Sequence, residues 1–212
     1  MIFDGDGLQL IASGIETENE ALLAAGFGAT VIGFDLFPSE HQISPSEVHD
    51  IVRRLPVGVH TMGVFRSEMP ERVCDVANRI GLHAVELRGS FNPSQIAYIA
   101  DRVRTVVRTI PLERLDLVTG LEVVDYVALP EEDDFDAWLG CVDWVREVGS
   151  RYRILARGLG PGPAPDVVRG LPVAGLMAGE SVRTITGRLD SWQLFEFLKK
   201  SRDAYESPWL GD

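Results

Sequence analysis

Charged or hydroxyl side chains stand where the short apolar runs of this sequence end. Arginine guanidiniums bind carboxylate and phosphate groups through paired hydrogen bonds. Aspartate and glutamate carboxylates can accept or donate protons in general acid–base catalysis. Together these residue types could bind a small anion and move a proton on it. In chain order the residues are Ser13, Asp35, Arg66, Arg88, Arg108, Glu131, Arg157 and Glu180.

The apolar runs have the length and the Val and Ile content of buried β-strands. Several are apolar at consecutive positions, which is typical of parallel strands that are covered on both faces. The strands are predicted at residues 8–13, 30–36, 59–65, 83–87, 105–110, 125–129, 153–156 and 173–177.

A stretch with helical spacing follows each strand. Thr17 and Glu20 have the spacing of a capping box, and Ser44-Pro45, Met69-Pro70 and Asn92-Pro93 each place a proline in a first turn. The helices are predicted at residues 19–26, from 45, from 70, from 93, and at 112–119, 136–148, 164–169 and 191–204.

Strands that alternate with helices imply parallel pairing with right-handed crossovers. Eight such units predict a closed (β/α)8 barrel, and residues 1–212 are expected to form this single domain. The alternative is an open doubly wound sheet, but no Gly-x-Gly-x-x-Gly follows the first strand. In the barrel, function belongs to the carboxyl ends of the strands and the loops after them.

The composition limits the partners. The chain has 212 residues with 32 acidic and 20 basic side chains, a net charge of −12, which disfavours nucleic acid and anionic membranes. No apolar run approaches the roughly 20 residues of a membrane span, and the start of the chain lacks the basic residues of a signal peptide. We expect a cytoplasmic monomer or homodimer that needs no cofactor and no metal and that binds a small anionic metabolite.

The ordered segments at residues 14–15, 28–34, 37–38, 43–45, 62–65, 81–89, 135–138, 154–159 and 178–180 resemble phosphoribosylanthranilate isomerase, a barrel enzyme of tryptophan biosynthesis. The resemblance implies a cysteine base at the end of the first strand and an aspartate acid at the end of the sixth. Ser13 and Leu129 stand in those places, and His41 falls where the family has an arginine for the substrate carboxylate. A serine hydroxyl is far less acidic than a thiol and leucine cannot donate a proton. We therefore expect the family reaction to be slow, with Glu131 as a substitute acid.

Glu86 and Arg88 share one strand face because side chains alternate along a strand. In the functional interpretation, Arg88 and Arg108 bind the substrate with His41, while Ser13, Asp35, Glu86 and Glu131 are the catalytic candidates. In the structural interpretation, Glu86–Arg88 and Asp35–Arg108 only neutralise each other, since buried charges must be paired.

The last two loops carry the small residues that permit close approach of the backbone to a phosphate. A phosphate site is predicted from Arg157, Gly158, Gly160, Gly179 and Arg183. The alternative is that these glycines only form turns. The acidic run at residues 131–134 is interpreted as a solvated loop rather than a metal site.

Three functions stay open. The first is a divergent isomerase- or lyase-type proton transfer on a small anion. The second is an inactive relative that serves as a binding or partner module. The third is a genuine phosphoribosylanthranilate isomerase with substituted catalytic residues.

Overall fold

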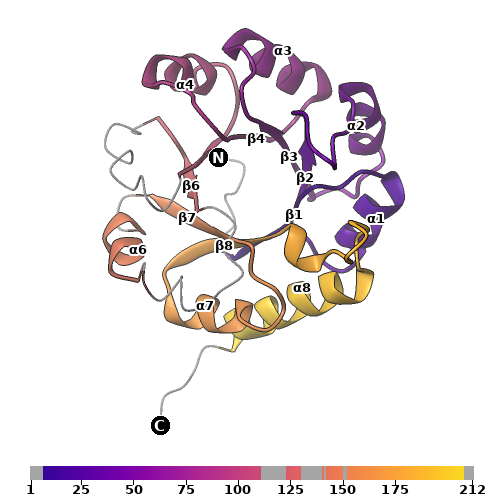
Figure 1. Cartoon of the computed structure of the whole chain (residues 1–212), viewed down its shortest axis with the longest axis vertical. Helices are drawn as coiled ribbons and strands as arrows, with labels where there is room; N and C mark the ends of the chain where they lie inside the picture. The colour runs from indigo at the N-terminus through magenta and orange to yellow at the C-terminus, as the bar shows by residue number, and fades with distance from the viewer. Residues whose placement is uncertain (1–6, 111–122, 130–139, 141, 150–151, 208–212) are drawn as a thin grey trace.

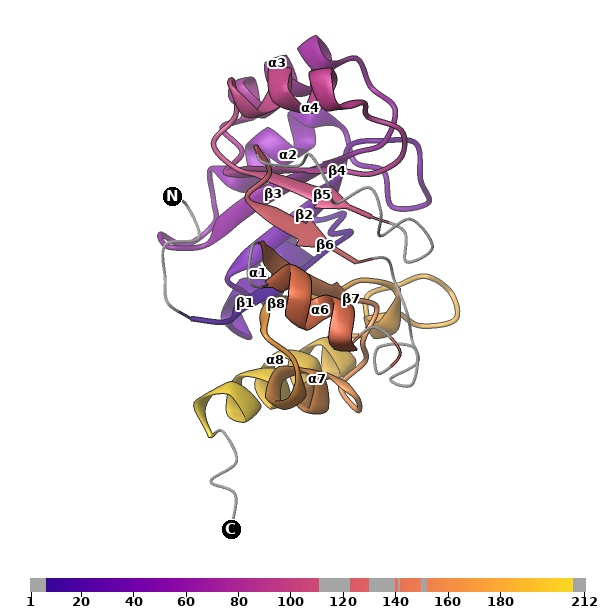
Figure 2. The same cartoon turned by 90° about the vertical axis from the view of Figure 1, so that its left-hand side faces the viewer.

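The computed structural model describes residues 7–110, 123–129, 140, 142–149 and 152–207. Within them the strands form a closed barrel in the order β1 to β8, and β8 pairs with β1. Each strand is parallel to its neighbours, so all strands end on the same side of the barrel (Figure 1, Figure 2). The predicted (β/α)8 barrel is confirmed.

The elements fall within a few residues of the predicted boundaries. The strands are β1 Gln9–Ala12, β2 Val31–Asp35, β3 His60–Phe65, β4 Ala84–Leu87, β5 Val106–Thr109, β6 Tyr126–Ala128, β7 Arg153–Arg157 and β8 Val173–Ala178. The described helices are α1 Glu18–Gly26, α2 Pro45–Val52, α3 Pro70–Ile80, α4 Pro93–Ala100, α6 Val142–Gly149, α7 Ala164–Gly170 and α8 Ser191–Glu206, with the short 3-10 helix η2 Glu180–Val182. The helix predicted at 112–119 and the first part of the one at 136–148 lie outside the described residues.

Helix starts were the most specific local predictions. Ser44 and Asn92 cap α2 and α4 with complete capping boxes, each followed by a first-turn proline. The capping box predicted at Thr17 is only half formed. Thr17 accepts a hydrogen bond from the Glu20 amide, but the Glu20 carboxylate accepts from the amide of Glu16 instead of the cap residue.

Two apolar layers follow from the alternation of side chains along the strands. The inner layer fills the barrel and comprises Ile11, Val31, Met62, Ala84, Val107, Tyr126, Ala128, Leu155 and Met177. A larger outer layer packs between the barrel and the helices. Side chains two positions beyond an inner-layer residue therefore face the barrel mouth, meaning the end of the barrel where the strands terminate.

No helix in the described part of the chain is both long enough and apolar enough to span a membrane.

Candidate active site at the barrel mouth

A small cavity opens at the barrel mouth. Its volume is about 30 Å³, room for one or two water molecules. Most predicted site residues meet here from separate strands and loops. The cavity is lined by Ser13, Gly14, Asp35, His41, Arg88, Arg157, Gly179, Glu180 and Arg183.

The floor of the mouth is an ion-pair network centred on Glu86, which is fully buried. Arg88 Nε donates to Glu86 Oε1 over 2.8 Å, and the Thr109 hydroxyl donates to the same oxygen over 2.6 Å. Arg157 Nη1 lies 3.5 Å from that oxygen. We call Glu86, Arg88, Thr109 and Arg157 the strand network, because they lie on or next to β4, β5 and β7.

Alternation along the strands explains this convergence. Glu86, Thr109 and Arg157 each lie two positions after an inner-layer residue, so all three point into the barrel. The predicted Glu86–Arg88 pair is therefore confirmed. Thr109 was not predicted, because the sequence alone does not show which face of its strand lines the barrel.

The two buried carboxyl groups of the mouth have opposite protonation behaviour. Burial alone would raise the pKa of Glu86. The charges of Arg88 and Arg157, with the hydrogen bonds from Arg88 and Thr109, outweigh burial and lower that pKa to about 2. For Asp35 burial dominates and raises the pKa, against the charge of Arg88 and the hydrogen bond from the Ser39 hydroxyl. Glu86 is thus a fixed anion, and Asp35 is the carboxyl group that more readily holds a proton.

Arg108 does not form the ion pair with Asp35 that the structural interpretation expected, and its binding of substrate remains a prediction. Its guanidinium donates to the carbonyl oxygens of Leu87 and Gly89, over 2.7 and 2.6 Å. Arg108 pairs in register with Leu87, whose side chain belongs to the outer layer. The Arg108 side chain therefore points away from the barrel interior. Within the described residues, its hydrogen bonds fix the end of β4 and do not join Asp35.

Gly89 is required at this turn. Its φ is +73°, and a Cβ there would lie 2.6 Å from the carbonyl oxygen of Arg66. Two arginines lie near the Phe37 ring at the same edge of the mouth. The Arg66 side chain is exposed, with its guanidinium carbon 6.0 Å from the centre of the ring. Arg88 lies over the same ring at 5.7 Å.

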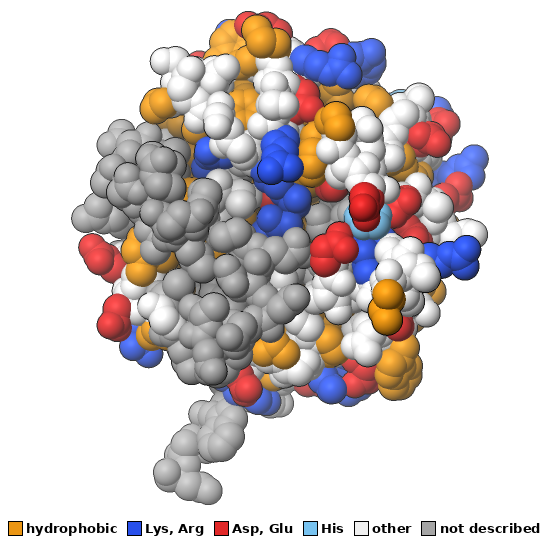
Figure 3. Space-filling model, in the orientation of Figure 1, with side chains coloured by type: hydrophobic (Ala, Val, Ile, Leu, Met, Phe, Trp, Pro, Cys, Tyr) orange, Lys and Arg blue, Asp and Glu red, His pale blue; other side chains and the backbone are white. Residues whose placement is uncertain are grey.

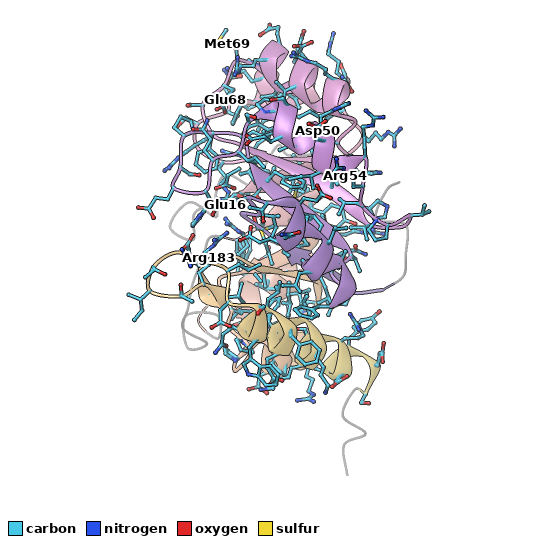
Figure 4. All side chains as sticks on the ribbon, turned by 90° about the vertical axis from the view of Figure 1, so that its right-hand side faces the viewer. Glu16, Asp50, Arg54, Glu68, Met69 and Arg183 are labelled. Carbon is cyan, nitrogen blue, oxygen red and sulfur yellow. The ribbon has the colours of Figure 1, made fainter. Side chains whose placement is uncertain are left out.

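A second set of charged groups joins the loops at the other side of the mouth. His41 Nδ1 lies 2.6 Å from Glu16, and its Nε2 lies 3.1 Å from Glu180. Arg183 contacts Glu16 over 3.3 Å and donates to the carbonyl oxygens of Gly14 and Gly187. We call Glu16, His41, Glu180 and Arg183 the loop clamp. It ties the loops after β1, β2 and β8 together, and Figure 4 shows Glu16 beside Arg183.

Glu16 belongs to this cluster although it was not among the predicted site residues. Glu16 lies four residues beyond the end of β1, in a loop on the face where function was expected. That position was the available signal, but the sequence does not show that Glu16 meets His41, which lies 25 positions further along the chain.

The predicted phosphate residues lie around the loops after β7 and β8. The Ser181 hydroxyl donates to the carbonyl oxygen of Leu159 and so holds the two loops together. Arg157 turns into the barrel, where its Nε donates to the sulfur of Met177. Gly158 has a φ of +80°, which suits a tight turn. Phosphate binding by Arg157, Gly158, Gly160, Gly179 and Arg183 remains a prediction.

The positions suggested by the family resemblance differ in their placement. Ser13 is buried and faces the cavity. Leu129 packs in the outer layer between barrel and helices, because the preceding residue, Ala128, is the one in the inner layer. Its side chain is therefore directed away from the mouth, and its match to the family's acid remains a prediction. Glu131 lies outside the described residues.

Figure 3 looks onto the mouth. Blue side chains lie near its centre, and red side chains surround a histidine beside them. Among the described residues, no group of three or more His, Cys, Asp or Glu side chains is arranged to hold a metal ion. The site is built instead from guanidinium, carboxyl and imidazole groups.

The fold and the mouth define a (β/α)8-barrel protein with a polar cavity at the carboxyl ends of its strands. Comparison with known proteins narrows this class. The chain is 29% identical to N-(5'-phosphoribosyl)anthranilate isomerase of Trichlorobacter lovleyi, over 90% of this chain and 96% of the relative. Identity to the enzyme of the same name from Thermotoga petrophila is 28%, over 89% and 96%. The chain is similar in sequence to the phosphoribosylanthranilate isomerases over nearly its whole length.

Solved structures of phosphoribosylanthranilate isomerases share the fold of this chain. The crystal structure of phosphoribosylanthranilate isomerase from Thermotoga maritima superposes with a TM-score of 0.83 at 25% identity, covering 93% of this chain and all of that one. A complex of such an isomerase with reduced 1-(o-carboxyphenylamino)-1-deoxyribulose 5-phosphate superposes with a TM-score of 0.81 at 24% identity, covering 93% and 100%. No protein-family model matches the chain.

Proposed function

We propose that this chain is a divergent enzyme of the phosphoribosylanthranilate isomerase type, which transfers a proton on a small substrate bearing carboxylate or phosphate. Asp35 carries the proton, and Arg88 and Arg157 orient the anionic group. The observation that carries the proposal is the contrast between two carboxyl groups in one mouth. Environments that separate the protonation of neighbouring acids are typical of acid–base sites.

Among the candidates that the structure describes, Asp35 fits the role of proton carrier better than Glu86 and Ser13 do. It lines the cavity and is only 7% exposed, and its raised pKa brings it closer to neutral pH. Glu86 remains ionised under the same conditions because the strand network stabilises its charge. Ser13 lines the same cavity, but an unactivated hydroxyl is a poor base.

Conversion of N-(5'-phosphoribosyl)anthranilate by the purified chain is the first assay, because the relatives carry the name of that reaction. Asp35→Asn is expected to lower turnover at least about 100-fold, the scale of one acid–base group. Ser13→Ala should change it by less than about threefold. The matched control is Asp50→Asn, which removes an exposed carboxylate on α2.

Phosphate-bearing sugars and aromatic carboxylates form the second panel, followed by product analysis after long incubation. Turnover that survives Asp35→Asn but is lost in Ser13→Ala would overturn the assignment of the proton carrier. Growth of a tryptophan-requiring strain that lacks the isomerase, when supplied with this chain, would instead support a genuine phosphoribosylanthranilate isomerase with substituted residues.

A binding module without catalysis is the second candidate function. The cavity of about 30 Å³ is far smaller than a phosphoribosyl compound, and the strand network already pairs the arginines with Glu86. Calorimetry with the same panel separates the two functions. If a ligand binds but is not turned over in any assay, and if Asp35→Asn leaves its dissociation constant unchanged, the result supports a binding module without catalysis.

The relatives also bear on assembly. A structure of the Thermotoga maritima isomerase is described as mutually generated monomers of a dimeric enzyme. We propose a monomer or homodimer in the cytoplasm, with a small anionic metabolite as the ligand. Light scattering on the purified chain distinguishes the two assembly states.

A further inference from the structure

The two arginines proposed to bind a ligand's anion already contact an anion of the protein itself. Glu86 accepts from Arg88 Nε and Nη2, over 2.8 and 3.3 Å, and lies 3.5 Å from Arg157. Arg88 thus binds Glu86 as a guanidinium fork binds the carboxylate of a ligand.

This internal anion cannot leave its place. Glu86 lies in the middle of β4, and its side chain has no exposed surface. The Thr109 hydroxyl donates to it from β5, which adds a second fixed strand to the arrangement. A ligand therefore meets Glu86 in position, whatever the surrounding loops do.

Arg88 is the part of the strand network that a ligand can reach. Its side chain is 19% exposed and lines the cavity, whereas Arg157 is 6% exposed. An anion that binds Arg88 from the cavity shares the guanidinium with Glu86. The repulsion between that anion and Glu86 grows in proportion to the ligand's charge, and burial weakens the screening of this repulsion.

We infer that Glu86 is a specificity-determining residue that makes the mouth select singly charged anions over doubly charged ones. The inference rests on the proposed function in one respect, that the mouth binds a small anion at Arg88 and Arg157. It goes further by naming the charge of the preferred group. At Arg88, carboxylates, sulfonates and phosphodiesters are favoured, and phosphate monoesters in their doubly ionised form are disfavoured; a phosphate group elsewhere on the same ligand is not affected.

The test uses two probes of the same shape and different charge. Benzenesulfonate carries one negative charge, and phenylphosphonate carries two above its second ionisation. Their dissociation constants are measured by calorimetry with the full chain, with Glu86→Gln, and with Glu71→Gln, an exposed carboxylate on α3, as the control. Thr109→Val is a second control, because it removes a hydrogen bond to Glu86 but leaves its charge.

The full chain is expected to bind benzenesulfonate at least as tightly as phenylphosphonate. In Glu86→Gln, phenylphosphonate binding should tighten about tenfold or more relative to benzenesulfonate, because the nearby fixed charge is gone. Glu71→Gln and Thr109→Val should leave the ratio within about threefold, because both keep the charge of Glu86. If the ratio of the two dissociation constants is the same in Glu86→Gln as in the full chain, the inference is overturned.

A second measurement uses only the full chain, so it tests the inference even if the Glu86→Gln variant does not fold. Phenylphosphonate is titrated into the full chain below and above its second ionisation, with benzenesulfonate over the same pH range to correct for titration of the protein. Corrected affinity should not rise as the second charge appears; a tenfold rise contradicts the inference. If neither probe binds to any variant, the proposed anion site fails as well, whereas failure of the ratio alone leaves the proposed function standing.

Discussion

The two sides of the barrel mouth use similar charged groups on different supports. The strand network holds Glu86, Arg88, Thr109 and Arg157 on or next to hydrogen-bonded strands, with Glu86 fully buried. In the loop clamp, Glu16 and His41 lie on loops and Glu180 and Arg183 lie in and directly after the short helix η2; the Glu16 and Glu180 side chains are 38% and 61% exposed. Ion pairs at exposed sites contribute little to stability, whereas a buried charge depends strongly on its partners. The strand network is therefore expected to contribute more to stability than the loop clamp does.

Removal of the Glu86 carboxylate should have the largest effect on stability and therefore tests the difference between the two sides most directly. Glu86→Ala leaves Arg88 and Arg157 without their shared buried partner. We expect a loss of about 3–5 kcal/mol in the free energy of unfolding, measured by urea denaturation. Glu180→Ala on the clamp is the matched control. Equal losses at the two sites would refute the distinction between them.

Acid titration tests the same residue without changing its shape. The folded pKa of Glu86 is about 2, against an ordinary value of 4.5, so its contribution is complete above 4.5 and lost as pH falls toward 2. That difference corresponds to about 3 kcal/mol at neutral pH. Unfolding free energies of the full chain and of Glu86→Gln should converge by this amount as the solution is acidified. Parallel curves across that range would contradict it.

Asp35→Asn tests a carboxyl group whose pKa is shifted in the opposite direction, upward instead of downward. A raised pKa means that the folded state holds the Asp35 proton more tightly than the unfolded state does. Stability from this group is therefore greatest at low pH and declines as pH rises from 3.8 through the folded pKa. The amide of the substituted side chain stays neutral, so the variant should be at least as stable as the full chain at neutral pH and lose less stability as pH rises. A marked loss at neutral pH, absent from Asp50→Asn, would count against the assignment.

The clamp should give the smallest effect. Glu180→Gln removes one exposed carboxylate from His41, and we expect a loss below about 1 kcal/mol that shrinks further in high salt. Chemical denaturation at low and high salt measures it. A loss as large as that of Glu86→Ala would show that the loops contribute as much as the strands.

The fold could be predicted because its signals are local. Eight apolar runs separated by capped helices indicate a barrel, and Ser44 and Asn92 fulfil their predicted caps. Glu86 and Arg88 could be paired in advance because a strand places alternate residues on one face. The same rule separates Thr109, which points inward, from Arg108, which does not. Applying the rule required knowledge of which strand face lines the barrel, and the sequence alone does not give that.

The loop clamp could not be predicted. Arg183 and Gly14 are 169 positions apart, and their contact exists only because β8 pairs with β1. His41 likewise meets Glu16 and Glu180 only after three loops converge.

The amino-acid sequence by itself determined the alternation of strands and helices, the eightfold count and the charged residues at the strand ends, because periodicity and capping act over a few residues. Tertiary structure decided which of those charges meet. Barrel closure fixes the strand register, and the register decides that Glu86 joins Arg88, Thr109 and Arg157 while Arg108 binds carbonyl oxygens at the rim. Burial raises the pKa of both carboxyl groups, but the guanidiniums and hydrogen bonds around Glu86 outweigh it, so the pKa values of Asp35 and Glu86 shift in opposite directions.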